Sequence, residues 1–175
     1  MSNPEAKNNY QDLSNQEAVA KIKELAEDIK TCMFCTELSS RPFPTRPMAL
    51  QEVDDRGNLW FISSATSNKN FEINQDNDVQ LIFAKNQDSH FLSVYGQATI
   101  YKDRAHIEEV WSPIAKAWFE EGKDDPNVTV IKVTPSDAYY WDTKYGKMIS
   151  FLKYAKGAIT GNMDDDLGIE GKLNV

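Results

Sequence analysis

The feature that most constrains the fold of this chain is a series of five strand-forming runs within about seventy residues. Each run is rich in β-branched and aromatic residues, and several alternate polar with apolar side chains. The runs cover residues 32–38, 46–53, 58–64, 79–84 and 90–101. Because strands this close along the chain leave little room for the long crossovers of parallel pairs, the pattern predicts an antiparallel meander.

Three local features indicate how these runs fold. The turn-forming residues 54–58 predict a hairpin between the second and third runs. Gly96 lies in the middle of the longest run, where a glycine commonly marks the bend of a strand at a barrel corner. Residues 58–63 do not alternate, so we expect both faces of that strand to be covered. These features favour a small closed barrel.

Helical periodicity precedes and follows the strands. Residues 14–30 carry apolar side chains at steps of three and four, and Ser14 with Glu17 has the spacing of a capping box. Residues 103–121 return to a helical period, and Ser112-Pro113 fits the start of a second short helix. We therefore predict one N-terminal helix and an excursion of two short helices.

The remaining elements complete one domain. Residues 128–133 and 138–141 predict two more strands, and residues 147–159 predict a C-terminal helix. The expected fold is mainly β with flanking α: an antiparallel barrel of six or seven strands over residues 14–161. Residues 1–13 are expected to be a flexible N-terminal tail and residues 162–175 a flexible acidic tail.

Charge and missing motifs exclude several functions. With 19 Lys and Arg against 27 Asp and Glu, the net charge of −8 argues against binding to nucleic acid or to anionic lipid. No stretch approaches the roughly 20 apolar residues of a membrane span, and the N-terminus lacks the pattern of a signal peptide, so we expect a cytoplasmic protein. The motifs G-x-G-x-x-G, G-x-x-x-x-G-K-[ST] and G-x-S-x-G are also missing.

The two cysteines, Cys32 and Cys35, have the C-x-x-C spacing of redox and zinc sites. Zinc needs about four ligands, and beyond this pair the chain offers only the distant His90 and His106. A strand would direct side chains three residues apart to opposite faces. The favoured interpretation is therefore two small core residues, with a thiol redox pair as the alternative.

Positive charge gathers at one place in this acidic chain. The hairpin brings the start of the second strand, with Arg46, toward the segment Ser67-Asn68-Lys69 after the third strand. A guanidinium, an ammonium and the first N–H groups of a short helix over residues 68–74 would together hold a phosphomonoester. The alternative is that these are ordinary surface cations paired with neighbours such as Glu72.

The order and spacing of several motifs resemble the pyridoxamine 5′-phosphate oxidase-like split barrels that bind flavin mononucleotide (FMN). The first half carries Arg46-Pro47-Met48, residues 57–63, Ser67-Asn68-Lys69, and a strand from Asp78 to Phe83. The second half, through residues 109–113, 116–119, 122–126 and 138–142, is similar to the general stress protein branch of that family.

This resemblance implies a site for FMN in a cleft between the two subunits of a homodimer. Arg46, Ser67 and Lys69 would contact the phosphate, with Asn68 where many relatives have arginine. The backbone of Pro47, Met48 and Ala49 would lie along the isoalloxazine ring, and Ile62 and Ser63 would line its other edge, with the adjoining Phe61 also counted among the cofactor-binding residues. Trp141 matches an aromatic residue that the partner chain contributes in the true oxidases. FAD or a deazaflavin would be the less expected ligand.

Two departures from the family pattern bear on activity. Gln51 stands where the true oxidases have a lysine, and residues 144–150 lack their C-terminal arginine and histidine signature for the pyridoxine substrate. The resemblance therefore implies a flavin-dependent oxidoreductase with NADH or NADPH as the candidate electron donor. It also implies that true pyridoxamine 5′-phosphate oxidase activity is lost. A non-catalytic flavin carrier or regulatory flavin-binding module is the alternative.

Other candidates carry weaker signals. We expect the aromatic residues of the helical excursion, Trp111, Trp118 and Phe119, to lie in the core; the alternative is a surface that stacks on a ring. We expect structural roles for His90 and His106; the alternative is acid–base catalysis. The aspartate runs lack the spacing of a calcium loop, so no metal site is expected.

Overall fold

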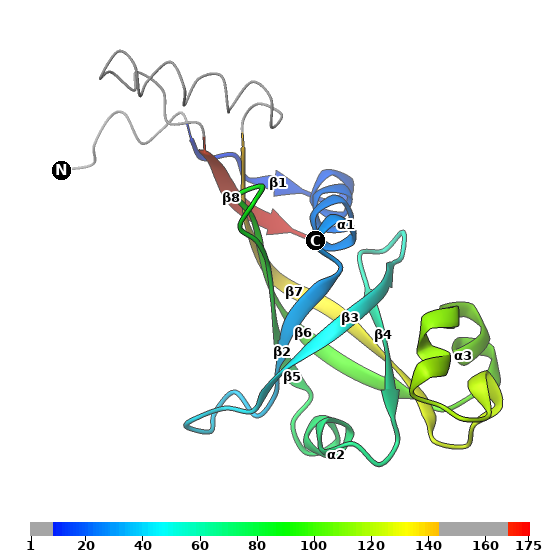
Figure 1. Ribbon diagram of the computed structural model, residues 1–175. Helices are drawn as coiled ribbons and strands as arrows, with labels where there is room; N and C mark the ends of the chain where they lie inside the picture. Colours follow the sequence, from blue (N-terminus) through cyan, green and yellow to red (C-terminus); the bar gives the residue numbers. More distant parts are fainter. Residues whose placement is uncertain (1–8, 144–167) are drawn as a thin grey trace.

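Six antiparallel strands close into a barrel in this computed structural model, which describes residues 9–143 and 168–175 (Figure 1). In chain order they are β2 (Thr31–Cys35), β3 (Thr45–Val53), β4 (Leu59–Ser64), β5 (Asp78–Lys85), β6 (His90–Tyr101) and β7 (Val128–Thr143). The spatial order is β7-β4-β3-β2-β5-β6, and pairing between β6 and β7 closes the barrel. The predicted mainly β antiparallel barrel is confirmed, with six strands in the closed part.

The strand β7 is continuous where the sequence predicted two strands, at residues 128–133 and 138–141. It continues because the pairing with β6 shifts register between Tyr95 and Gly96, which places Gly96 opposite Pro135. A Cβ on Gly96 would overlap the carbonyl oxygen of Thr134. The irregularity predicted at Gly96 therefore exists. Because the register shifts there, the residues between the two predicted strands stay within β7.

The expectation of flexible tails is wrong for both described ends. Strand β8 (Gly168–Asn174) pairs with the second half of β7, and the short β1 (Leu13–Ser14) pairs with β8. The backbone of Gln11 passes close to Gly171: a Cβ at position 171 would overlap the carbonyl oxygen of Gln11. Because Ser14 lies in β1, helix α1 (Gln16–Ile29) begins after Asn15, and the predicted capping box does not form.

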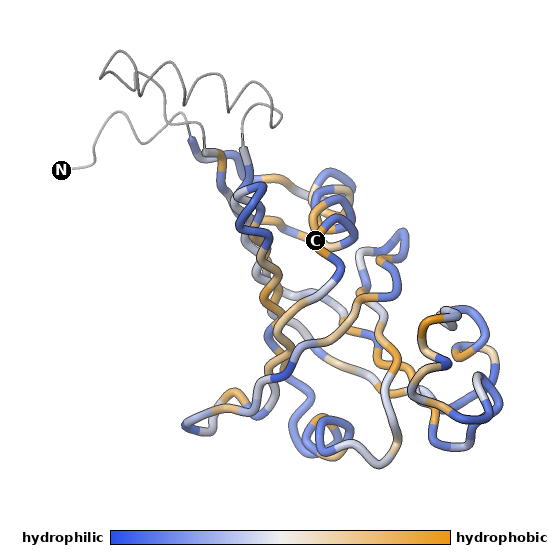
Figure 2. The backbone as a smooth tube through the Cα atoms, in the orientation of Figure 1, coloured by the Kyte–Doolittle hydropathy of each residue, from blue (hydrophilic) through white to orange (hydrophobic). Residues whose placement is uncertain are grey.

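Two hydrophobic cores lie on the two faces of β4. Inside the barrel, Phe61 packs with Phe34 and with the buried stripe of α1, as the helical period predicted. Outside, Trp60 packs against α3 (Arg104–Val110) and Phe119. Figure 2 shows the hydrophobic residues concentrated along the strands and on the inner sides of the helices. Both faces of β4 are thus covered, as expected.

The helical excursion after β6 contains α3 and two 3-10 turns, η2 (Pro113–Ala117) and η3 (Gly122–Asp124). Its aromatic residues do not share one environment. Phe119 is buried and Trp111 is half-buried, whereas Trp118 is 72% exposed. The prediction of a common core is therefore wrong for Trp118.

Both cysteines are buried free thiols on β2. Burial raises the pKa of Cys32 to about 12, so its thiolate, the reactive form, is strongly disfavoured. This supports the core interpretation over a thiol redox pair. No helix in the described part of the chain has the length and apolar composition to cross a membrane. The helix predicted over residues 147–159 lies outside the described residues.

Candidate functional site

The pairing between β3 and β4 is incomplete: the start of β3 and the end of β4 do not pair with each other, and this unpaired region is called the gap below. The ladder between these strands runs from Val53 and Leu59 only as far as Leu50 and Phe61. Beyond it, residues 45–49 pair with β2 and residues 62–64 pair with β7. Figure 1 shows the two strands diverging from their hairpin, with α2 (Asn68–Gln75) below them. Two strand edges with backbone N–H and C=O groups outside their shared ladder therefore face this gap.

A buried network of hydrogen bonds fixes α2 at the base of the gap. Ser67 caps the helix by accepting a hydrogen bond from the backbone N–H of Asn70. The Asn70 side chain accepts from Ser63 at 2.7 Å and donates to Thr129 of β7 at 2.9 Å. The N–H groups of Asn68 and Lys69 in the first turn have no partner within the helix, which makes this end suited to an anion.

Lys69 places a buried ammonium group beside this helix end. The residue is only 8% exposed, and its Nζ donates to Ser63 Oγ at 2.5 Å and to Ser67 Oγ at 3.3 Å. Both partners are neutral, and no ion pair of Lys69 occurs within residues 9–143 and 168–175. Burial, with the charge of Arg46 as a smaller cause, lowers the pKa of Lys69 to about 8. A desolvated cation of this kind is well suited to an anionic ligand.

Arg46 lies near Lys69 but is already held by partners. Its guanidinium donates to Thr36 Oγ1 at 2.6 Å and to Glu72 Oε2 at 2.7 Å. Thr36 in turn donates to the same Glu72 oxygen at 2.5 Å. Glu72 belongs to α2, one turn after Lys69. Because Arg46 binds Glu72, both cations lie beside the same helix. The structure thus brings Arg46, Ser67 and Lys69 together, and it also gives Arg46 the carboxylate partner of the alternative interpretation.

The residues expected along the flavin ring occupy the open edge of β3. Pro47 and Ala49 are exposed and Met48 is half-buried, all on the segment that does not pair with β4. Gln51, at the register shift between the strands, donates from its side chain to the carbonyl oxygen of Ala49 at 3.1 Å. This edge is therefore accessible, and its shape is partly set by Gln51.

The other expected contacts differ in their surroundings. Ser63 faces Lys69, and Asn68 is exposed at the first position of α2. Ile62 packs toward the outer core. Phe61 is fully buried in edge-to-face contact with Phe34 at 5.4 Å, so its side chain is not free to line a ligand. Trp141 lies at the opposite end of β7 from Thr129 and does not reach Lys69 within one chain.

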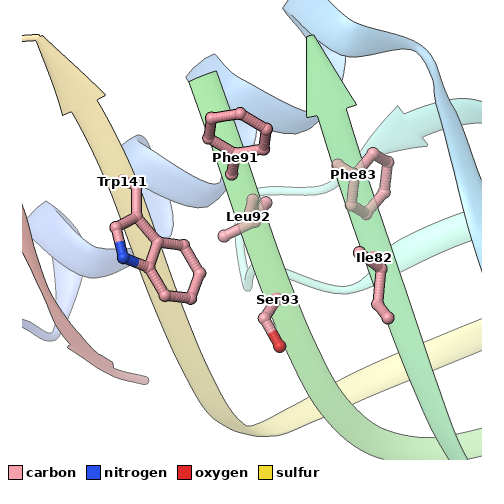
Figure 3. Close-up of a pocket in the computed structure, with 6 residues that line it drawn as sticks. All are labelled: Ile82, Phe83, Phe91, Leu92, Ser93 and Trp141. Carbon is pink, nitrogen blue, oxygen red and sulfur yellow. The ribbon is translucent and has the colours of Figure 1, made fainter. Parts of the chain in front are cut away.

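Trp141 borders an open apolar groove on the outer face of the barrel, shown in Figure 3. The groove has a volume of about 520 Å³ and is lined by Ile82, Phe83, Phe91, Leu92, Ser93 and Trp141. Ile82 is a direct cross-strand neighbour of Met33 on β2, and both side chains are more than 40% exposed. A row of exposed apolar side chains therefore crosses β2, β5 and β7, and it is separate from the cationic cluster.

The two histidines have structural partners. His90 lies between carboxylates, with Nδ1 at 3.1 Å from Asp28 and Nε2 at 3.1 Å from Asp142. Asp28, Asp88 and His90 bring three possible ligand atoms together, but Lys85 already contacts both aspartates. His106, in the first turn of α3, packs on Tyr101 and contacts Asp103, the residue that caps this helix.

Sequence reasoning missed three groups at the site: Thr36, Asn70 and Thr129. Each lies far along the chain from at least one of its partners, so no local spacing marks it. The only signal is the residue type, a short polar side chain in an otherwise apolar strand or at a helix start.

The structure is a small antiparallel barrel with a cationic cluster at the start of a short helix, next to the place where two strands diverge. Residues 17–165 match the family model Pyridoxamine 5'-phosphate oxidase like. The chain belongs to that family.

Individual relatives agree with this assignment. Protein bli-3 of Neurospora crassa is 29% identical over an alignment of 126 residues. The match covers 67% of this chain and 60% of that protein, so it spans less than two thirds of that relative. A structure described as general stress protein 26, from Jannaschia sp. CCS1, aligns with a TM-score of 0.75 and 22% identity, and covers 92% of this chain and 100% of its own. The general stress FMN/FAD binding protein of Xanthomonas citri aligns with a TM-score of 0.64 and 25% identity, and covers 75% of this chain and 93% of its own.

Proposed function

We propose that this protein binds FMN at the gap between β3 and β4 and acts as a flavin-dependent oxidoreductase of the general stress protein type, without true pyridoxamine 5′-phosphate oxidase activity. The observation that carries the proposal is the buried Lys69 ammonium, which lacks an ion pair in the described residues and lies beside the first turn of α2. The relative from Xanthomonas citri, named as an FMN/FAD binding protein, supports a flavin as the ligand.

The residues present fit a phosphate-bearing flavin. Lys69, Ser67 and the N–H groups at the start of α2 would hold the phosphate, and Arg46 would add a second cation. The open edge at residues 47–49 offers backbone groups that could meet the carbonyls and nitrogens of the ring. When bound, FMN supplies reversible hydride and electron transfer, while the protein binds and orients it.

The proposal includes a homodimer that completes the site. Met33, Ile82 and Trp141 expose apolar surface on the outer face of the barrel, where a second copy would cover them. Within one chain Trp141 lies at the opposite end of β7 from Thr129, which contacts Asn70 of α2, so in this proposal a partner subunit would bring the Trp141 side chain to the ring.

The first experiment asks whether the purified protein holds FMN. An FMN titration followed by absorbance and fluorescence should show binding, and the double variant Arg46→Ala/Lys69→Ala should lose it. The matched control is Arg56→Ala/Lys116→Ala, which removes the same charge from exposed positions. Unchanged FMN affinity in the first double variant would reject the site.

A second experiment separates the oxidoreductase from the non-catalytic carrier. FMN-loaded protein is mixed anaerobically with NADH or NADPH, and flavin absorbance is followed. Rapid bleaching supports the enzyme, whereas no reaction with either donor favours a carrier or regulatory module.

A further inference from the structure

We propose that Glu72 is an internal competitor for the phosphate: it occupies Arg46 in the free protein and so limits the affinity of the site for phosphorylated ligands. This inference rests on the proposed function, because it concerns the same anion site. It assigns Glu72 a role in specificity that is separate from holding the fold together.

The first step is that Glu72 binds Arg46 as a ligand oxygen would. Glu72 Oε2 lies 2.7 Å from the Arg46 guanidinium and accepts a second hydrogen bond from Thr36 at 2.5 Å. The Glu72 and Arg46 side chains are only 13% and 24% exposed. A charge-assisted pair this short and this shielded competes directly with an incoming anion.

The second step is that a phosphate cannot contact both cations without meeting Glu72. Lys69 and Glu72 are separated by one turn on α2, which places them on the same side of the helix. Burial lowers the pKa of Lys69 most; the Arg46 charge lowers it further and the Glu72 carboxylate raises it, so both charges act on the Lys69 ammonium. A phosphate oxygen between Arg46 and Lys69 would therefore approach the Glu72 carboxylate, which repels it.

The third step excludes a role for Glu72 as the only support of Arg46. Thr36 is fully buried on the segment after β2, and its hydroxyl accepts from the Arg46 guanidinium at 2.6 Å. This contact remains when the Glu72 charge is removed. Arg46 would thus keep its orientation while its bond to Glu72 became available to the ligand.

The test compares FMN with riboflavin, which has the same ring and no phosphate. In Glu72→Gln the carboxylate charge is lost and the shape is kept, so FMN should bind about tenfold more tightly than to the wild-type protein. Riboflavin affinity should not change. Glu121→Gln, an exposed carboxylate elsewhere, is the matched control and should change neither affinity.

Several results would overturn the inference. Weaker FMN binding by Glu72→Gln would show that Glu72 positions Arg46 for the ligand. An equal change in the affinities for FMN and riboflavin would show that Glu72 does not act through the phosphate. Unchanged FMN affinity would remove any role. If Glu72→Gln does not fold, Glu72→Ala is tested in the same way.

A separate measurement keeps this inference apart from the proposed function. If the wild-type protein binds no flavin, the proposed function fails, and inorganic phosphate then serves as the probe. Thermal unfolding in increasing phosphate should show a larger rise in Tm for Glu72→Gln than for wild type. An equal or smaller rise would overturn the competition.

Discussion

Replacing Lys69 with Met should stabilise the free protein while abolishing its affinity for phosphate ligands. Burial lowers the pKa of Lys69 from 10.5 to about 8, which at about 1.4 kcal/mol per pKa unit means that charging this group costs the fold roughly 3 kcal/mol. Losing the hydrogen bonds to Ser63 and Ser67 offsets part of this gain, so the net stabilisation at neutral pH should be about 1–2 kcal/mol.

The stability difference between wild type and Lys69→Met should also depend on pH. Between about pH 8 and 10.5 the unfolded chain keeps the Lys69 proton and the folded chain loses it, so wild-type stability rises with pH relative to Lys69→Met. Urea unfolding at about pH 7 and about pH 9.5 should therefore show the advantage of Lys69→Met shrinking by about 2 kcal/mol. The exposed control Lys116→Met should show no such change.

Two results would refute the reasoning about Lys69. The first is a Lys69→Met protein that is less stable than wild type at neutral pH, because then the ammonium would be a net stabilising group. The second is wild-type FMN affinity in that variant, because then the buried charge would serve no ligand.

Three further predictions concern the barrel. Ile82→Asp should convert the proposed dimer to monomer in size-exclusion chromatography with light scattering, because Ile82 is 45% exposed on the apolar outer face; an unchanged mass would contradict the interface. Gly96→Ala should lower the free energy of unfolding by roughly 2–4 kcal/mol, since its Cβ would overlap the backbone of Thr134; wild-type stability in urea would show that the strand does not bend there. Asp28→Asn should destabilise the protein at neutral pH but not at about pH 2. The hydrogen bond from Lys85 holds the pKa of the Asp28 carboxyl below its ordinary value, so its contribution exists above the unfolded pKa and is lost as pH falls through the folded one; a difference that persists in acid urea titrations would contradict it.

The strands of the barrel could be predicted because their periodicity is local. Each of β2 to β6 overlaps a predicted run, and α1 buries the predicted stripe. The sequence predicted two strands where the structure has the single strand β7. The local sequence could not show this continuity, because it depends on the pairing of Pro135 with Gly96 of β6.

Strand β8 was missed because composition hid its pattern. Ile169, Gly171 and Leu173 alternate with Glu170 and Lys172, but glycine and nearby aspartates suggested a flexible tail. The pairing partner on β7 supplies the order that the local sequence does not.

The cationic cluster could be predicted in part. Arg46 and Lys69 do lie near each other, as predicted, but β3 and β4 diverge beyond their hairpin, and it is α2 that carries Lys69 and Glu72 to Arg46. The bonds from Arg46 to Thr36 and Glu72 join three separate elements, so their geometry follows only from the closed barrel. The flavin itself stays a prediction, supported by the family and by the chemistry of this cluster.

The central claim is that the Lys69 ammonium and the first turn of α2 hold the phosphate of a flavin. A crystal structure of the protein grown with FMN tests this most directly. We expect the phosphate within hydrogen-bond distance of Lys69 Nζ, with the ring along residues 47–49. A phosphate bound away from Lys69, or a gap between β3 and β4 filled by protein side chains, would contradict the account.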